Sequence, residues 1–193
     1  MAVFVARERR RELRVCEGTL RVLRDADRMV RSEQARSSRV ELQSSSNVQA
    51  AARSVRSAVA GTTCRVVVNG YLEDAVFSGA DGVHLRERWL SEKGAADFVS
   101  RARVAMNGGV VGCSAHSVES VLAAAKAGVD YVQIGTMFRT MTHPEKVDVE
   151  GPELVSAAVD ALRGLEQEHK VRLLLIGVGG IDASNCADVT RAG

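Results

Sequence analysis

The chain has 193 residues, of which 46% are hydrophobic and 26% are charged. This length and composition favour one folded domain with a sizeable core and exclude a largely disordered chain. The formal net charge is only +2, so the charge balance does not indicate a nucleic-acid partner. Because no apolar run reaches the roughly 18 residues that a membrane-spanning helix needs, we expect no membrane segment either.

Residues 1–38 are rich in arginine and carry no identifying motif. Residues 2–6 could form a first strand and residues 20–35 a first helix, although the alternating arginines and acids are typical of a solvated helix face. Four widely spaced cysteines without a C-x-x-C motif predict reduced thiols and a cytoplasmic protein. Import into an organelle is the alternative suggested by the Arg-rich start, and the interleaved acids argue against it.

From residue 39 onward, short β-branched runs alternate with longer helical stretches, which is typical of βα units around a parallel sheet. The expected strands are residues 40–43, 65–69, 82–85, 109–114, 131–135 and 173–177. Helical periodicity predicts helices over residues 48–60, 118–127 and 153–168. With a doubtful first strand and a missing last one the count reaches eight, so we predict an incomplete α/β barrel of the TIM (β/α)8 type over residues 39–193.

An internal repeat marks the start of two of these strands. Residues 78–84 read Ser-Gly-Ala-Asp-Gly-Val-His, and residues 127–133 read Ala-Gly-Val-Asp-Tyr-Val-Gln. Each copy predicts a helix end, a left-handed glycine cap, an acid and then a strand. A third copy begins at residue 191, two residues before the last residue of the sequence, so the sequence predicts one βα unit fewer than a complete barrel.

Two glycines, Gly179 and Gly180, lie between the last expected strand and a following helical segment. Chemistry in such barrels lies at the carboxyl ends of the strands, where bare backbone N–H groups suit a phosphate. A tight structural turn explains two glycines about as well. The loop at residues 135–144 places Thr140 and Thr142 on one side of an extended segment, which predicts a grip on a phosphate or carboxylate; an ordinary hydroxyl-rich loop is the alternative.

Two histidines, His84 and His116, also follow expected strands. Single histidines at such positions more often orient a loop through a backbone hydrogen bond than act as bases. We therefore expect neither of them to be catalytic.

Four segments together resemble thiamine-phosphate synthases, in register over residues 39–193, and the related thiazole tautomerases share most of these motifs. The first is NGYLEDAVFSGADGVHL at residues 69–85, and the second is GCSAHS at 112–117, similar to GVSVH. Residues 135–142 are similar to G-P-x-F-x-T-x-T, and residues 177–185 to A-I-G-G-I-x-x-x-N. The resemblance implies a transferase of thiamine biosynthesis that acts on small phosphorylated substrates.

The family joins hydroxymethylpyrimidine diphosphate to a thiazole phosphate and releases pyrophosphate with the help of Mg²⁺. By resemblance, the pyrimidine diphosphate contacts Gln43, Asn69 and Ser114, and the thiazole phosphate contacts Thr140, Thr142, Gly179 and Gly180. His143 stands where the family has a lysine, and we include it among the substrate-binding residues.

The departures from the family pattern gather at the diphosphate end. Three serines at 44–46 replace an arginine and a lysine, and Gly70 and Trp89 stand at the positions of the metal carboxylates. Neither glycine nor indole can hold Mg²⁺. The acids that could act as displaced ligands are Glu73, Asp74 and Glu87. The alternatives to a synthase are a barrel that binds a phosphorylated ligand or a protein partner without turnover, and a truncated, inactive copy.

Overall fold

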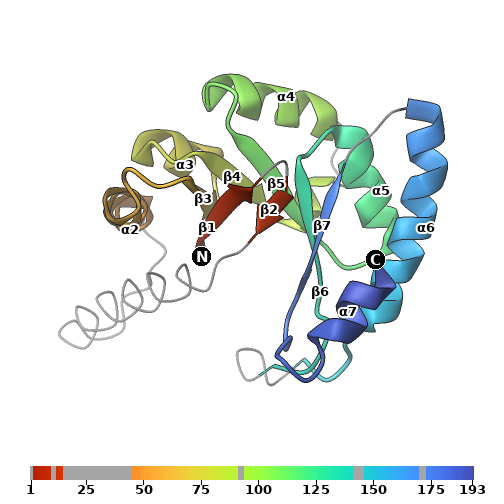
Figure 1. The fold of residues 1–193 in the computed structure, drawn as a ribbon. Coiled ribbons are helices and arrows are strands. Elements are labelled where there is room, and N and C mark those ends of the chain that lie inside the picture. The colour runs from red at the N-terminus through yellow and green to blue at the C-terminus, as the bar shows by residue number, and fades with distance from the viewer. Residues whose placement is uncertain (1, 10–11, 15–44, 91–93, 141–145, 170–172) are drawn as a thin grey trace. The chain divides into compact units, whose positions relative to one another are not determined.

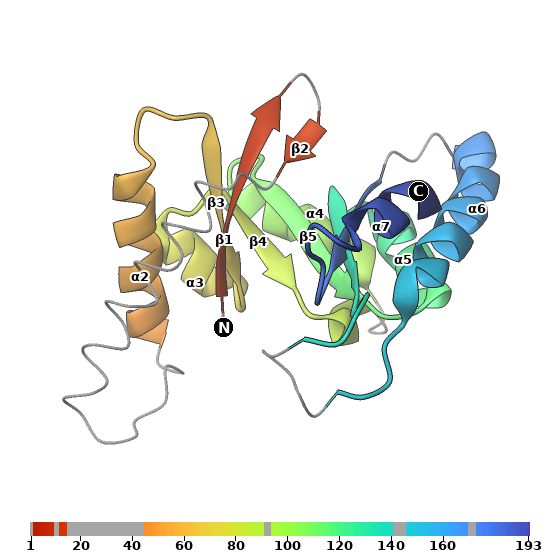
Figure 2. The ribbon, with the colours of Figure 1, turned by 60° about the horizontal axis from the view of Figure 1, so that its bottom comes forward.

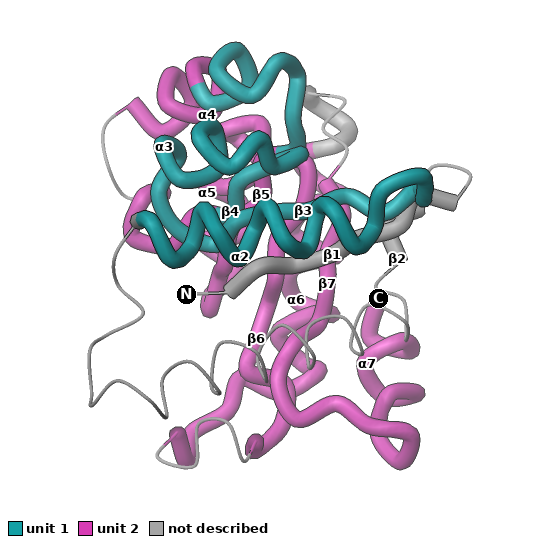
Figure 3. The backbone as a smooth tube through the Cα atoms, turned by 90° about the vertical axis from the view of Figure 1, so that its left-hand side faces the viewer, with its two compact units in different colours: residues 1–84, 102–110 teal, residues 85–101, 111–193 magenta. Residues whose placement is uncertain are grey.

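The computed structural model describes residues 2–9, 12–14, 45–90, 94–140, 146–169 and 173–193 (Figure 1). The expected strand at 40–43 and helix at 20–35 lie outside these residues, as do Gln43, Thr142 and His143. The chain divides into two compact units, residues 1–84 with 102–110 and residues 85–101 with 111–193 (Figure 3).

Unit 1 contains four strands in the order β2-β1-β3-β4. They are β1 (Ala2–Arg9), β2 (Glu12–Arg14), β3 (Cys64–Asn69) and β4 (Gly82–Leu85). β3 and β4 pair in parallel, as the βα pattern predicts. A strand is present where residues 2–6 were expected to form one, but β1 runs antiparallel to β3, unlike the parallel strands of a barrel. It pairs with the edge of β3 opposite β4.

The described part of unit 1 contains the helices α2 (Ser45–Ala58) and α3 (Leu72–Ser78), which lie side by side (Figure 2). Val48, Ala52 and Val55 of α2 are buried, and their spacing places them on one helix face. The middle of β3 is buried on both faces, as expected for a strand in a covered parallel sheet. α3 ends at Gly79, whose φ of 66° gives the predicted left-handed cap.

Unit 2 contains three parallel strands in the order β5-β6-β7. They are β5 (Val110–Ala115), β6 (Tyr131–Gly135) and β7 (Leu174–Val178). The helices are η1 (Glu87–Leu90), α4 (Ala95–Ala105, shared with unit 1), α5 (Val118–Ala127), α6 (Gly151–His169) and α7 (Cys186–Ala192). α6 packs against both α5 and α7 (Figure 1). None of the helices in the described residues has the length and apolar character needed to cross a membrane.

The internal repeat has the same structural role in both units. The carboxylate of Asp81 accepts a hydrogen bond from the N–H of Val66 at 2.7 Å, and the Asp81 N–H donates to the Val66 carbonyl at 2.8 Å. Asp130 makes the same two hydrogen bonds with Val111, both at 2.8 Å. Each acid therefore ties the start of its strand to the preceding strand in two places, which explains why the repeat keeps the acid.

Candidate functional site

The candidate site lies in unit 2, where β5, β6 and β7 end. Because the three strands are parallel, their carboxyl ends meet at one edge of the sheet, the edge at which such folds carry their chemistry. The residues that follow them are His116 after β5, Thr136 after β6, and Gly179 with Gly180 after β7.

Gly179 and Gly180 form a turn that only glycine fits. Their φ angles are 96° and 64°, in the left-handed region that other residues seldom adopt. A Cβ on Gly180 would lie closer than 3.0 Å to the carbonyl oxygens of Phe138 and Arg139. A Cβ on Gly179 would approach Thr136 as closely. The backbone of residues 136–139 therefore packs directly against this turn.

Backbone hydrogen bonds hold these two segments together and leave donors on the turn unused. Met137 and Phe138 donate to the carbonyls of Val178 and Gly179, both at 2.9 Å. Within the described residues, the N–H groups of Gly180 and Ile181 donate to no other group. Consecutive N–H donors beside glycine are the groups from which a phosphate accepts hydrogen bonds.

The side chain of Asn185 fixes the far side of the turn. Its Nδ2 donates to the Gly180 carbonyl at 2.9 Å, and its Oδ1 accepts from the Asp182 N–H at 2.8 Å. The Asp182 Oδ1 accepts hydrogen bonds from the backbone N–H of Ser184 at 2.8 Å and from its hydroxyl at 2.6 Å. These bonds lower the pKa of the Asp182 carboxyl, so the acid stays charged at neutral pH.

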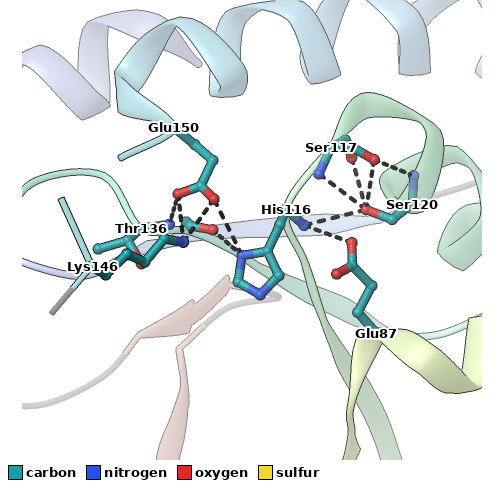
Figure 4. Close-up of polar contacts among 8 residues, drawn as sticks. Glu87, His116, Ser117, Ser120, Thr136, Lys146 and Glu150 are labelled. Carbon is teal, nitrogen blue, oxygen red and sulfur yellow. Dashed lines mark hydrogen bonds and ion pairs between the residues drawn. The ribbon is translucent and has the colours of Figure 1, made fainter. Parts of the chain in front are cut away.

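Glu150 binds both backbone polar groups of Thr136 (Figure 4). The Glu150 N–H donates to the Thr136 carbonyl at 2.9 Å, and the Thr136 N–H donates to Glu150 Oε2. Lys146 Nζ lies 2.7 and 3.0 Å from the two carboxylate oxygens. Partial burial would raise the pKa of Glu150, but the hydrogen bonds from Lys146 and Thr136 together outweigh it and hold the pKa below its usual value.

His116 orients the loops around it, as its position in the sequence predicts. Its ring Nδ1 is hydrogen-bonded to the carbonyl oxygen of Gly135 and lies 3.7 Å from Glu150 Oε1 (Figure 4). Its backbone N–H donates to Glu87 Oε1 at 2.9 Å. His84, the second histidine considered in the sequence, lies within β4 and is fully buried, and burial lowers its pKa to about 4. His84 is therefore neutral at physiological pH.

The remaining predicted residues lie on several elements. Asn69 ends β3 in unit 1, Ser114 lies in β5 in unit 2, and Thr140 lies in the loop after β6, at the end of the described stretch 94–140. The sequence did not single out Glu150, Lys146 or Thr136. For Glu150, the only signal in the sequence was an acid directly before the helix start at Gly151–Pro152, and this signal does not indicate which residue the acid contacts.

The residues that the sequence resemblance places at metal positions do not fit Mg²⁺. Gly70 offers no side-chain oxygen, and Trp89 stacks on Phe98 with ring centroids 4.9 Å apart. Asp74 is 1% exposed and accepts from Gln49 Nε2 at 3.0 Å, while its second oxygen has no partner. The described residues contain no group of three or more His, Cys, Asp or Glu side chains arranged to hold a metal.

Comparison with known proteins gives one family. A family model described as thiamine monophosphate synthase matches residues 3–193. A thiamine-phosphate synthase of Chloroflexus aurantiacus is 33% identical over 66% of this chain and 52% of its own length. One from Methanoculleus marisnigri is 36% identical over 74% of this chain and 61% of its own length. The chain therefore spans about half to three fifths of these relatives.

A solved structure shows the fold. Thiamine phosphate pyrophosphorylase from Pyrococcus furiosus is similar with a TM-score of 0.59 at 21% sequence identity, over 80% of this chain and 66% of that one. The predicted fold class, an incomplete α/β barrel of the TIM type, is confirmed by this likeness and by the parallel βα pattern within each unit.

Proposed function

The chain belongs to the thiamine monophosphate synthase family, and we propose that it binds a phosphorylated thiazole and joins it to hydroxymethylpyrimidine diphosphate, releasing pyrophosphate. Its partners would then be small phosphorylated substrates. The free cysteines Cys64, Cys113 and Cys186 support a reducing, cytoplasmic setting for this function.

The observation that carries the proposal is the turn at Gly179 and Gly180. Two consecutive N–H groups, those of Gly180 and Ile181, are available to a ligand, and positive φ with close packing explains why glycine is needed there. A phosphate oxygen that accepts from both donors would lie at the carboxyl end of β7. By the sequence resemblance we assign Thr140 and Thr142 as hydroxyl donors to the same phosphate, and the start of their loop, at Met137 and Phe138, is hydrogen-bonded to the residues of the turn.

The diphosphate substrate is assigned to Gln43, Asn69, Ser114 and His143. Departure of a diphosphate requires positive charge near the oxygen that becomes negative. In the family Mg²⁺ supplies such charge, but Gly70 and Trp89 provide no ligand for it in this chain. We derive no step through the metal, and the part assigned to this chain's residues is to hold and orient the two substrates.

The residues near the assigned diphosphate site support a second candidate function, which is binding of a phosphorylated ligand without turnover. Trp89 is engaged in a ring stack with Phe98, and Glu87, the nearest acid in sequence, already accepts from the His116 backbone. The chain thus keeps the groups expected to bind the thiazole phosphate but lacks the metal ligands expected at the diphosphate.

Pyrophosphate release in the presence of both substrates and Mg²⁺ tests the proposal. We expect slow release, because one missing charge at a leaving group is commonly worth about a hundredfold. The variant carrying Gly70→Asp, Trp89→Asp and His143→Lys should release pyrophosphate faster. If the unmodified chain binds the thiazole phosphate and releases none, the second candidate is correct. Fast release that Glu87→Gln abolishes would instead show a rearranged metal site.

A further inference from the structure

We propose that Glu150 is a positioning residue for the phosphate site: it fixes Thr136, and through Thr136 the loop that packs against Gly179 and Gly180. The inference rests on the proposed function, because it assumes that this turn binds phosphate. It concerns a residue that the sequence motifs do not include.

Glu150 is hydrogen-bonded to both the backbone N–H and the backbone carbonyl of Thr136. Residues 14 positions apart exchange one backbone hydrogen bond of 2.9 Å and one hydrogen bond from the Thr136 N–H to the carboxylate. The two together leave Thr136 neither a free donor nor a free acceptor on its backbone. A hydrogen bond to a charged acceptor is stronger than one between neutral groups, so the carboxylate carries much of this restraint.

Thr136 transmits the restraint to the turn. A Cβ on Gly179 would lie closer than 3.0 Å to Thr136 Cγ2, which shows how little space separates the two residues. The next residues, Met137 and Phe138, donate to the carbonyls of Val178 and Gly179 at 2.9 Å. A displacement of Thr136 would therefore move the segment that defines one wall of the turn.

Lys146 makes this arrangement compatible with an anionic ligand. Its Nζ lies within 3.0 Å of both Glu150 oxygens, so it offsets the negative charge that would otherwise oppose a phosphate nearby. The direction in which a Glu150 substitution changes phosphate affinity therefore distinguishes a role of its charge from a role in positioning Thr136. If Glu150 acted only through its charge, removing it would free Lys146 and tighten phosphate binding. If it positions Thr136, removing it weakens binding.

Thr136→Pro provides a matched test of the same contact. Proline has no N–H, so the hydrogen bond to the Glu150 carboxylate cannot form. The loops that residues 135–142 resemble have proline at this place, so we expect the loop to accommodate the substitution. In the Thr136→Pro background the carboxylate has lost its main target, and Glu150→Ala should have little further effect.

The experiment measures the Kd for inorganic phosphate from the amide shifts of Gly180 and Ile181 in ¹⁵N-labelled protein. The variants are Glu150→Ala, Glu150→Gln, Thr136→Pro and the double variant with Glu150→Ala, each checked by its Tm. Asp160→Ala is the control, because Asp160 is an exposed acid of α6 paired with Arg163 at 2.8 Å. Gly180→Ala tests the phosphate site itself.

We expect Glu150→Ala to raise the Kd about tenfold, the equivalent of one hydrogen bond to a charged group, and Glu150→Gln to raise it less because its amide oxygen still accepts. Thr136→Pro loses the same hydrogen bond and should raise the Kd to a similar extent, the double variant should match Thr136→Pro within about threefold, and Asp160→Ala should bind normally. If Glu150→Ala is poorly folded, the Glu150→Gln value decides.

Unchanged or tighter binding by both Glu150 variants, with Gly180→Ala defective, would overturn the positioning role and leave the proposed function intact. Absence of phosphate shifts at Gly180 and Ile181 in the unmodified chain would overturn both.

Discussion

Gly180→Ala should destabilise the fold more than an alanine at the cap glycine Gly128. Two effects add at this position. The residue has a φ of 64°, and an L-residue in the left-handed region costs roughly 1–2 kcal/mol. The new Cβ would also lie closer than 3.0 Å to two backbone carbonyl oxygens, those of Phe138 and Arg139, and such overpacking typically costs about 1–3 kcal/mol.

Gly128→Ala is the matched control for this substitution. Gly128 has a φ of 80°, but a Cβ there would meet nothing within 4 Å, so only the conformational penalty of roughly 1–2 kcal/mol applies. For Gly180→Ala we expect a loss of about 2–5 kcal/mol. In a protein of this size each kcal/mol lowers the Tm by about 2–4 °C, so the two variants should be distinguishable.

The assay combines urea unfolding with phosphate titration of both variants. Gly180→Ala should lose about 2–5 kcal/mol of unfolding free energy and should no longer bind inorganic phosphate, whereas Gly128→Ala should still bind it. The reasoning is refuted if the two variants are equally stable and both bind phosphate like the unmodified chain.

Three further predictions concern other parts of the fold. Asp81→Ala and Asp130→Ala each leave a strand N–H without its carboxylate acceptor, so each should lower the free energy of unfolding by about 1–3 kcal/mol; urea unfolding that shows a cost for only one would contradict the shared role of the repeat. His84 should remain neutral down to about pH 4 because burial lowers its pKa. Since the histidine of the unfolded chain is protonated near pH 6.5, the free energy of unfolding should fall as the pH drops from 6.5 toward 4. An NMR titration midpoint of His84 near 6.5 in the folded protein would be inconsistent with burial. Burial, with a smaller contribution from Glu87, raises the pKa of Cys113 to about 12, so at pH 8 iodoacetamide should alkylate the exposed Cys186 and spare Cys113, which mass spectrometry of the folded protein can check.

The sequence predicts what depends on local pattern. The strand at 131–135 and the helix at 118–127 were placed at their observed bounds, because β-branched runs and helical periodicity are local properties. The Gly-x-Asp repeat predicted both the glycine caps and the acids at the strand starts, since a left-handed cap has few acceptable residues. The role of His116 as an orienting residue followed from its place just after a strand.

The sequence does not predict contacts between residues far apart along the chain. Glu150 and Thr136 meet only because β6 and the start of α6 bring residues 14 positions apart together. The antiparallel pairing of β1 with β3 is another case, since the pattern of residues 2–9 indicates a strand but not the direction of its partner. In both cases the missing information is tertiary.

The most direct test of the account is the ¹H–¹⁵N spectrum of the unmodified chain titrated with inorganic phosphate. The account predicts saturable shifts of the Gly180 and Ile181 amides, whose N–H groups donate to no other described residue, with smaller changes at Thr140. Shifts spread over exposed lysines and arginines, with the Gly180 and Ile181 amides unmoved, would contradict it.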